Sequence, residues 1–113
     1  MRREPAIYIV MFLWPPWAWG KSLWSMILLH RRALAPKYRD WLPTLIAHEL
    51  VHYDQWMRYG FFGFLTRYIG DWARNGFNYQ KIELELEAWV LENDEAYLTR
   101  ARALIDRYIP PVR

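Results

Sequence analysis

The sequence predicts one small α+β domain, residues 1–113, that is mainly helical, with an N-terminal β-hairpin packed on a central helix and two further helices. Its 113 residues fit a single domain, and 54% of them are hydrophobic, including eight Trp and eight Tyr, so one core can be filled. Two short apolar runs rich in β-branched and aromatic residues come first. Three segments with apolar residues at helical spacing follow.

Two runs near the N-terminus indicate strands. They are residues 7–13 (IYIVMFL) and 23–29 (LWSMILL), and a short helix is the alternative for the second run. The segment between them, PPWAWGKS, contains Pro, Gly and Ser, which are typical of loops. We therefore expect the two runs to pair as an antiparallel hairpin.

Two helices are predicted in the middle of the chain. Residues 30–40 are polar and broken by a proline, so we interpret them as a connector. Asp40 is placed to cap a helix over residues 41–59, which Gly60 ends. Residues 61–75 also repeat apolar side chains at helical spacing, although they include two glycines.

A long C-terminal helix is predicted over residues 79–109. Pro110 and Pro111 stop it, because proline lacks the N–H that a continuing helix needs. An interruption near Asn93 and Asp94 is the alternative to one continuous helix.

Charge and composition exclude several classes of protein. The net charge is +3, and the basic residues are spread along the chain, so we expect no nucleic-acid surface. Without cysteine there are no disulfides, thiolate ligands or thiol nucleophiles. The apolar N-terminal segment is cut by Pro15-Pro16 and Gly20-Lys21 into runs of roughly nine and seven residues, whereas a transmembrane span needs about 20. No signal-peptide cleavage site follows, so a cytoplasmic location is expected, with a virion-associated one as the alternative.

The stretch HELVH lies inside the helix predicted over residues 41–59. Residues four apart share a helix face, so His48 and His52 can direct both imidazoles at one metal ion. Glu49 is rotated by about 100° from His48, which places its carboxylate beside the ion as a general base and not as a ligand. Chance would give this pattern about once in two hundred such sequences. The alternative is two partly exposed histidines on a helix face.

A catalytic zinc site usually has three protein ligands, so a third must come from elsewhere. Carboxylates on the predicted C-terminal helix are the available source, since the only other histidine is His30. Ile82, Trp89 and Ala96 lie within roughly 60° of Glu85 on a helical projection, as does Glu92, so Glu85 projects among side chains that are mostly apolar. The opposite side carries a stripe that we expect to be solvated, formed by Glu83, Glu87 and Asp94. The alternative for Glu85 is a pair with an arginine at a helix contact.

These residues resemble a known family. His48-Glu49-x-x-His52, followed after 32 residues by Glu85-x-x-Ala88, is similar to the pattern of the gluzincin metallopeptidases. It looks closest to minimal gluzincins and to short phage-encoded proteins with the same motif, and related domains occur in integral-membrane peptidases. The resemblance covers most of the chain and implies a gluzincin-like zincin core. It also implies that His48, His52 and Glu85 bind Zn²⁺ and that Glu49 is the catalytic base.

One position departs from the family pattern. The membrane relatives have Asp where this chain has Trp89, so the carboxylate that would orient a ligating histidine is missing there. Asp54 and Glu92 are the candidates to replace it.

The expected function is zinc-dependent hydrolysis of a peptide or protein substrate, with Glu49 moving the proton of the attacking water. Tyr53, Tyr79 and Tyr97 are candidate donors to the oxyanion, and the strand before the helix could hold an extended substrate by main-chain pairing.

Two other functions stay open. The chain could be a non-catalytic structural or adaptor component of a larger assembly, such as a phage particle, with the aromatic stretch WPPWAW as a contact for a protein partner or a second copy. It could also lie on a membrane surface through its aromatic N-terminal segment.

Overall fold

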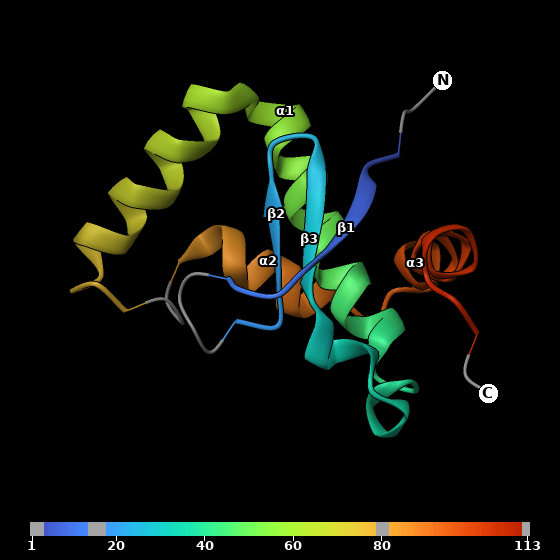
Figure 1. The fold of residues 1–113 in the computed structure, drawn as a ribbon. Helices are drawn as coiled ribbons and strands as arrows, with labels where there is room; N and C mark the ends of the chain where they lie inside the picture. Colours follow the sequence, from blue (N-terminus) through green and yellow to red (C-terminus); the bar gives the residue numbers. More distant parts are fainter. Residues whose placement is uncertain (1–3, 14–17, 79–81, 112–113) are drawn as a thin grey trace.

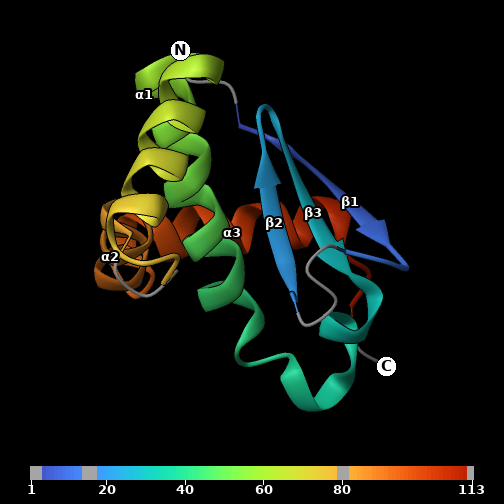
Figure 2. The ribbon, with the colours of Figure 1, turned by 90° about the vertical axis from the view of Figure 1, so that its left-hand side faces the viewer.

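The computed structural model describes residues 4–13, 18–78 and 82–111, which form a three-stranded sheet and three α-helices. In chain order the elements are β1 (Ala6–Val10), β2 (Gly20–Leu23), β3 (Met26–His30), two 3-10 helices (Arg31–Leu34 and Pro36–Tyr38), α1 (Leu42–Arg74), α2 (Glu83–Leu91) and α3 (Glu95–Tyr108). Figure 2 shows the sheet on one side of α1 and α2 on the other. This is a mainly helical α+β fold, as predicted.

The sheet has the order β1-β3-β2, and its topology corrects the predicted hairpin. The two apolar runs do pair, but in parallel, with Ile7 opposite Ile27. The antiparallel hairpin is formed by β2 and β3 instead. A tight turn at Trp24 and Ser25, inside the second apolar run, joins these two strands. Trp24 adopts a positive φ of 54°, which is uncommon for a residue other than glycine. The turn therefore carries no usual sequence signal.

The entry into α1 also differs from the prediction. The helix begins at Leu42, and its N-cap is Trp41, which makes no capping side-chain hydrogen bond, so the predicted cap at Asp40 is wrong. Proline in the first turn fixes the helical φ instead. The connector is ordered by two 3-10 helices, and the Nδ1 of His30 accepts a hydrogen bond of 3.1 Å from the Arg32 N–H.

A bend at Gly60 divides α1 into two arms, which match the two helices predicted over residues 41–59 and 61–75. Gly60 has φ 75° and ψ 171°, a backbone conformation that residues with a Cβ atom rarely adopt. Figure 1 shows α1 reaching the bend and returning toward α2. Across the bend, the rings of Trp56 and Phe64 stack with centroids 3.9 Å apart, which fixes the angle between the arms.

The predicted C-terminal helix is interrupted where the sequence allowed it. Helix α2 ends at Leu91, and α3 starts after Asp94, whose Oδ1 accepts a hydrogen bond of 3.0 Å from the Ala96 N–H. The beginning predicted at residue 79 lies outside the described residues, and the first described helical residue is Glu83.

The main core lies between the inner face of the sheet and the helices α1 and α3. Ile27 and Leu29 of β3, and Leu42, Ile46 and Leu50 of α1, are fully buried there. A second cluster fills the bend of α1 over α2, with Trp56, Phe64, Ile82 and Leu84. Among the described helices, none has the length and apolarity needed to cross a membrane.

Candidate metal centre

Two histidines of α1 face the space between the first arm of this helix and α2. His48 and His52 lie one turn apart, and their ring centroids are 5.0 Å apart. His52 is buried and His48 is partly buried. The amphipathic first arm turns its apolar residues toward the sheet and α3, which leaves this polar face toward α2.

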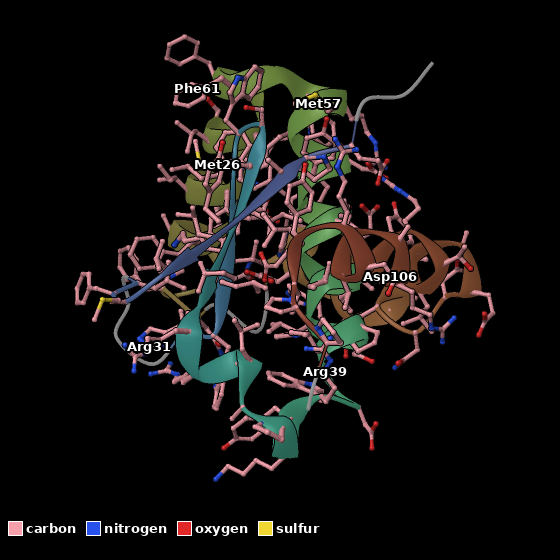
Figure 3. The ribbon with its side chains drawn as sticks, turned by 45° about the vertical axis from the view of Figure 1, so that its right-hand side comes forward. Met26, Arg31, Arg39, Met57, Phe61 and Asp106 are labelled. Atoms are coloured by element: carbon pink, nitrogen blue, oxygen red, sulfur yellow. The ribbon has the colours of Figure 1, made fainter. Side chains whose placement is uncertain are left out.

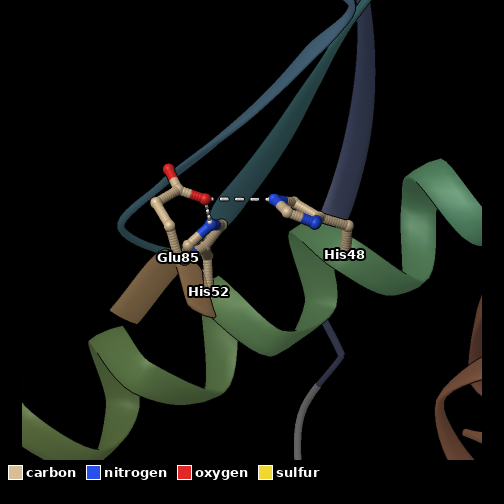
Figure 4. Close-up of side chains that lie close together, drawn as sticks. All are labelled: His48, His52 and Glu85. Atoms are coloured by element: carbon tan, nitrogen blue, oxygen red, sulfur yellow. Dashed lines mark hydrogen bonds and ion pairs between the residues drawn. The ribbon is translucent and has the colours of Figure 1, made fainter. Parts of the chain in front are cut away.

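Glu85 of α2 points at both rings. Its Oε1 accepts hydrogen bonds from Nε2 of His48, at 3.2 Å, and from Nε2 of His52, at 2.9 Å (Figure 4). Its other oxygen accepts a hydrogen bond of 2.7 Å from the Tyr68 hydroxyl, on the second arm of α1. One ligand atom from each of the three residues lies within 4.8 Å of the others, so the group could hold a metal ion.

The Nδ1 atom of each histidine, on the side of the ring away from Glu85, also makes a hydrogen bond. Nδ1 of His48 donates to Glu92 at 2.9 Å, and Nδ1 of His52 donates to the side-chain oxygen of Gln55 at 2.8 Å. Gln55 is fully buried, and its amide nitrogen donates to the Leu84 carbonyl and to Glu87, each at 2.9 Å. Such outer partners fix the ring orientation of a ligating histidine.

Of the two carboxylates proposed to orient a histidine, only Glu92 does so. Asp54 instead accepts hydrogen bonds from the Tyr97 hydroxyl, at 2.7 Å, and from Arg100, at 2.8 and 3.1 Å. Asp54 therefore ties α1 to α3, away from the histidine rings.

Without a metal ion, the pKa of each side chain in this group depends on hydrogen bonds and charges from the others. Burial disfavours the charged form of His48, but the hydrogen bonds to Glu85 and Glu92 and the charge of Glu49 outweigh it and raise its pKa from 6.5 to about 9. The pKa of His52 is raised in the same way, against its burial, chiefly by Glu85. Burial also opposes the Glu85 carboxylate, yet the hydrogen bonds from both histidines hold its pKa well below the ordinary value.

Glu49 is buried between this group and the edge strand β2. Burial raises the pKa of its carboxyl, and the charges of His52 and His48 offset part of that rise. The backbone N–H of Ser22 donates to this carboxylate. Gly20 also lies close, because a Cβ built on it would be 3.5 Å from Cγ of Glu49. A carboxyl with a raised pKa beside a candidate metal-binding group is suited to proton transfer.

The edge of β2 faces the same space. The His30 N–H bonds to the Trp19 carbonyl at 2.9 Å, and pairs along an antiparallel ladder alternate, so the backbone groups of Gly20 and Ser22 point away from β3. Those of Ser22 are used, since its carbonyl accepts from Trp56 at 3.3 Å and its N–H bonds Glu49. The backbone groups of Gly20, which lines the same space, point away from β3.

A cavity of about 730 Å³ lies over these groups. It is lined by the three metal-binding candidates, by Glu49 and Glu92, and by residues 18–23. The other lining residues belong to α1, its N-cap and α2, and most of them are aromatic or aliphatic: Trp41, Thr44, Leu45, Trp56, Phe64, Leu65, Tyr68 and Trp89. This volume is within the range of ligand-binding cavities, about 300 to 1,000 Å³.

Several expectations for the surroundings are corrected. Tyr97 bonds to Asp54, and neither it nor Tyr53 lines the cavity, while Tyr79 lies outside the described residues. Glu87 is not a purely solvated charge, because it supports Gln55 and pairs with Arg58 at 3.4 Å.

Sequence reasoning missed two side chains, Gln55 and Tyr68. Gln55 lies three residues after His52, on the same helix face, and this spacing could have revealed it. Tyr68 had no such signal, because its place depends on the bend in α1.

Comparison with protein-family models, with curated proteins and with solved structures gives no match. The fold and the site geometry are therefore the basis for the function.

Proposed function

We propose that the protein is a zinc-dependent metallopeptidase of the gluzincin type, in which His48, His52 and Glu85 bind zinc and Glu49 is the general base. The observation that carries the proposal is the convergence of Glu85 Oε1 on both histidine Nε2 atoms, at 3.2 and 2.9 Å, beside a buried glutamate. Two imidazoles and one carboxylate, with a place left for water, are the donor set of several zinc hydrolases.

The distances fit a zinc ion. Zinc lies about 2.0 to 2.2 Å from nitrogen and oxygen ligands, so ligand atoms in a tetrahedral site are about 3.3 Å apart. Two of the three separations are 3.2 and 2.9 Å, and all lie within 4.8 Å. Small side-chain shifts would complete the geometry. Glu92 and Gln55 hold the outer nitrogens, so the Nε2 lone pairs would face the ion once their protons leave.

The mechanism assigns a step to each residue. The chemistry that zinc supplies when bound is a lowered pKa, about 7, for the attacking water and a polarised scissile carbonyl. Glu49 takes the proton of that water and passes it to the leaving nitrogen as the C–N bond breaks. The Ser22 N–H keeps Glu49 in place, and Gly20 offers its backbone groups to an extended substrate.

Metal analysis of the purified protein tests the ligand set. Wild type should carry about one zinc per chain, Glu85→Ala should lose it, and Glu83→Ala should keep it, because Glu83 is exposed on the same helix. Iron should be measured too, since two histidines and a carboxylate also suit iron. A protein that holds iron alone, or a Glu85→Ala variant that keeps zinc, would contradict the proposal.

Glu49→Gln tests the base. The variant should retain zinc and lose peptide hydrolysis by a factor of about 100 to 10,000, the usual contribution of a general base. Hydrolysis at the wild-type rate in the zinc-loaded variant would end this mechanism.

A structural or adaptor role is the second candidate, favoured by exposed apolar side chains at two places. Met11 and Phe12, just after β1, are 74% and 68% exposed, and Phe62, at the bend, is 80% exposed. Figure 3 shows the neighbouring Phe61 and Met57 at that end of the molecule. Such side chains suit a protein contact, and a virion is one assembly that could provide it. This candidate is preferred if zinc removal unfolds the chain and the zinc-loaded wild type cleaves no peptide.

A further inference from the structure

The cavity has an apolar wall at each end, with the candidate metal group between them. At the bend of α1, the wall is formed by Leu23, Trp56, Phe64 and Leu65. Trp56 and Phe64 are only 3% and 6% exposed, whereas Leu23 is 43% exposed, so this wall combines tightly packed rings with an accessible leucine.

The opposite wall is open. It is formed by Trp19, Trp41 and Trp89, and the last two are 40% and 43% exposed. The rings of Trp19 and Trp41 meet edge to face, with centroids 5.4 Å apart. They present aromatic surface to whatever occupies the cavity.

The two histidines connect the walls. The ring centroid of His52 is 6.3 Å from that of Phe64, and the ring centroid of His48 is 6.5 Å from that of Trp89. A chain that lies along β2 across the metal group therefore meets apolar surface both before and after the bond beside Glu49.

The charges of the cavity do not suit the end of a peptide. Among the described lining residues, Lys21 is the only lysine or arginine, so no guanidinium is present to take a terminal carboxylate in two hydrogen bonds. The carboxylates that could take a terminal amine are already engaged, because Glu85 and Glu92 bond the histidines and Glu49 bonds the Ser22 N–H.

We propose that the site takes an internal segment of an extended peptide, with large apolar side chains on both sides of the bond that is cleaved. The wall at the bend, with Leu23, Trp56, Phe64 and Leu65, accepts one such side chain, and the open tryptophan end accepts the other. The enzyme is then an endopeptidase for hydrophobic segments, an inference that rests on the proposed function.

Binding to zinc-loaded Glu49→Gln protein tests the preference without hydrolysis. The probes are fluorescein-labelled ten-residue peptides, acetylated and amidated, with Phe, Asp or Lys at the two central positions. The Phe peptide should bind at least about tenfold more tightly, because each buried aromatic side chain adds apolar area. Free ends should change its affinity by less than about twofold. Equal affinities for the three peptides, or a marked gain from a free terminus, would overturn the inference.

Matched variants locate the two walls. Leu65→Ala should weaken binding of the Phe peptide about fivefold or more, whereas Ile69→Ala, one turn further on the same arm and outside the cavity, should not. Trp89→Ala should do the same at the open end, with the neighbouring Val90→Ala as its control. Zinc content and melting temperature, measured on all four, show that the site and the fold are intact. Equal loss in a variant and its control would overturn the assignment of that wall.

Cleavage by wild-type protein separates the two proposals. Selective cleavage of the Phe peptide supports both of them. Similar binding and cleavage of all three peptides would overturn the substrate class and leave the peptidase standing. Selective binding with no cleavage by zinc-loaded wild type would overturn the peptidase, and with it endopeptidase action, while the binding preference remained.

Discussion

Without metal, the stability of the folded protein should fall as the pH rises from about 6.5 to about 9, and zinc should cancel or reverse that fall. The metal-free His48 has its pKa raised from 6.5 to about 9 by Glu85, Glu49 and Glu92, despite its burial. Between these pH values, the folded state holds a proton that the unfolded chain has released. Folding is therefore stabilised fully below pH 6.5, and this contribution is lost as the pH rises to 9.

The size of the effect follows from the two pKa values. A pKa difference of one unit corresponds to about 1.4 kcal/mol, so the change from 6.5 to about 9 corresponds to about 3 kcal/mol of unfolding free energy. The His48 side chain is 15% exposed, so solvent screening reduces this only modestly. The raised pKa of His52 acts in the same direction. Against a typical stability of about 5 to 15 kcal/mol, the loss is readily measured.

The stabilisation of the folded state by bound zinc should increase with pH, opposite to the stabilisation by the histidine protons. An ion between the two Nε2 atoms must displace their protons, so its affinity rises with pH. Binding to the folded state alone stabilises it in proportion to the logarithm of the ratio of zinc concentration to Kd. The stabilisation by zinc should thus be larger at pH 9 than at pH 6.5.

Urea unfolding, with EDTA or with a buffered excess of zinc, measures both effects at the two pH values. His48→Gln should reduce the pH dependence in EDTA, and the double variant His48→Gln/His52→Gln should remove most of it. His30→Gln should leave it unchanged, because His30 lies outside the site and caps a 3-10 helix. Metal-free stability that is equal at pH 6.5 and 9, or a slope in His48→Gln as steep as that of the wild type, would refute the coupling.

Three further predictions concern the surrounding side chains. Glu92→Gln should weaken zinc affinity about 10- to 100-fold in a competition titration, because the histidine that Glu92 orients at 2.9 Å loses a charged partner; unchanged affinity would contradict this. Tyr68→Phe removes the 2.7 Å hydrogen bond to Glu85 and should weaken zinc affinity about tenfold. Tighter zinc binding by this variant would contradict the prediction. Arg100→Met leaves Asp54 without its 2.8 Å ion pair and should lower the unfolding free energy by about 3 kcal/mol in urea at unchanged zinc content; lost zinc would link this pair to the site.

The candidate ligands were predictable because their directions follow from local helical geometry. A helix repeats every 3.6 residues, so the positions of His48 and His52 already imply a shared face. The same period separated Glu85 and Glu92 from the exposed side of their helix, and both side chains face the histidines in the structure. It misjudged Glu87, which reaches Gln55 around the edge of α2.

The sheet was less predictable, because strand pairing depends on turns and on contacts distant in sequence. The turn at Trp24 and Ser25 contains no Gly, Asn or Asp, so the apolar pattern predicts one continuous strand across it. With β3 inserted between the other two strands, β1 and β3 run in parallel and β2 becomes one of the two edge strands. The strand order places the backbone of β2 beside Glu49. The alternation of apolar residues alone does not reveal this order.

The bend at Gly60 connects these two kinds of information. The sequence marked Gly60 as the end of a helix, but only its φ of 75° and the stacking of Trp56 on Phe64 set the direction in which the chain returns. That direction brings Tyr68 to within 2.7 Å of the second oxygen of Glu85. A straight helix would place Tyr68 about 24 Å along the axis from His52, at 1.5 Å per residue. The polar partners of the candidate metal centre are therefore assembled by one helix folding back on itself, and the glycine that permits the fold is as much a part of the site as the side chains that line it.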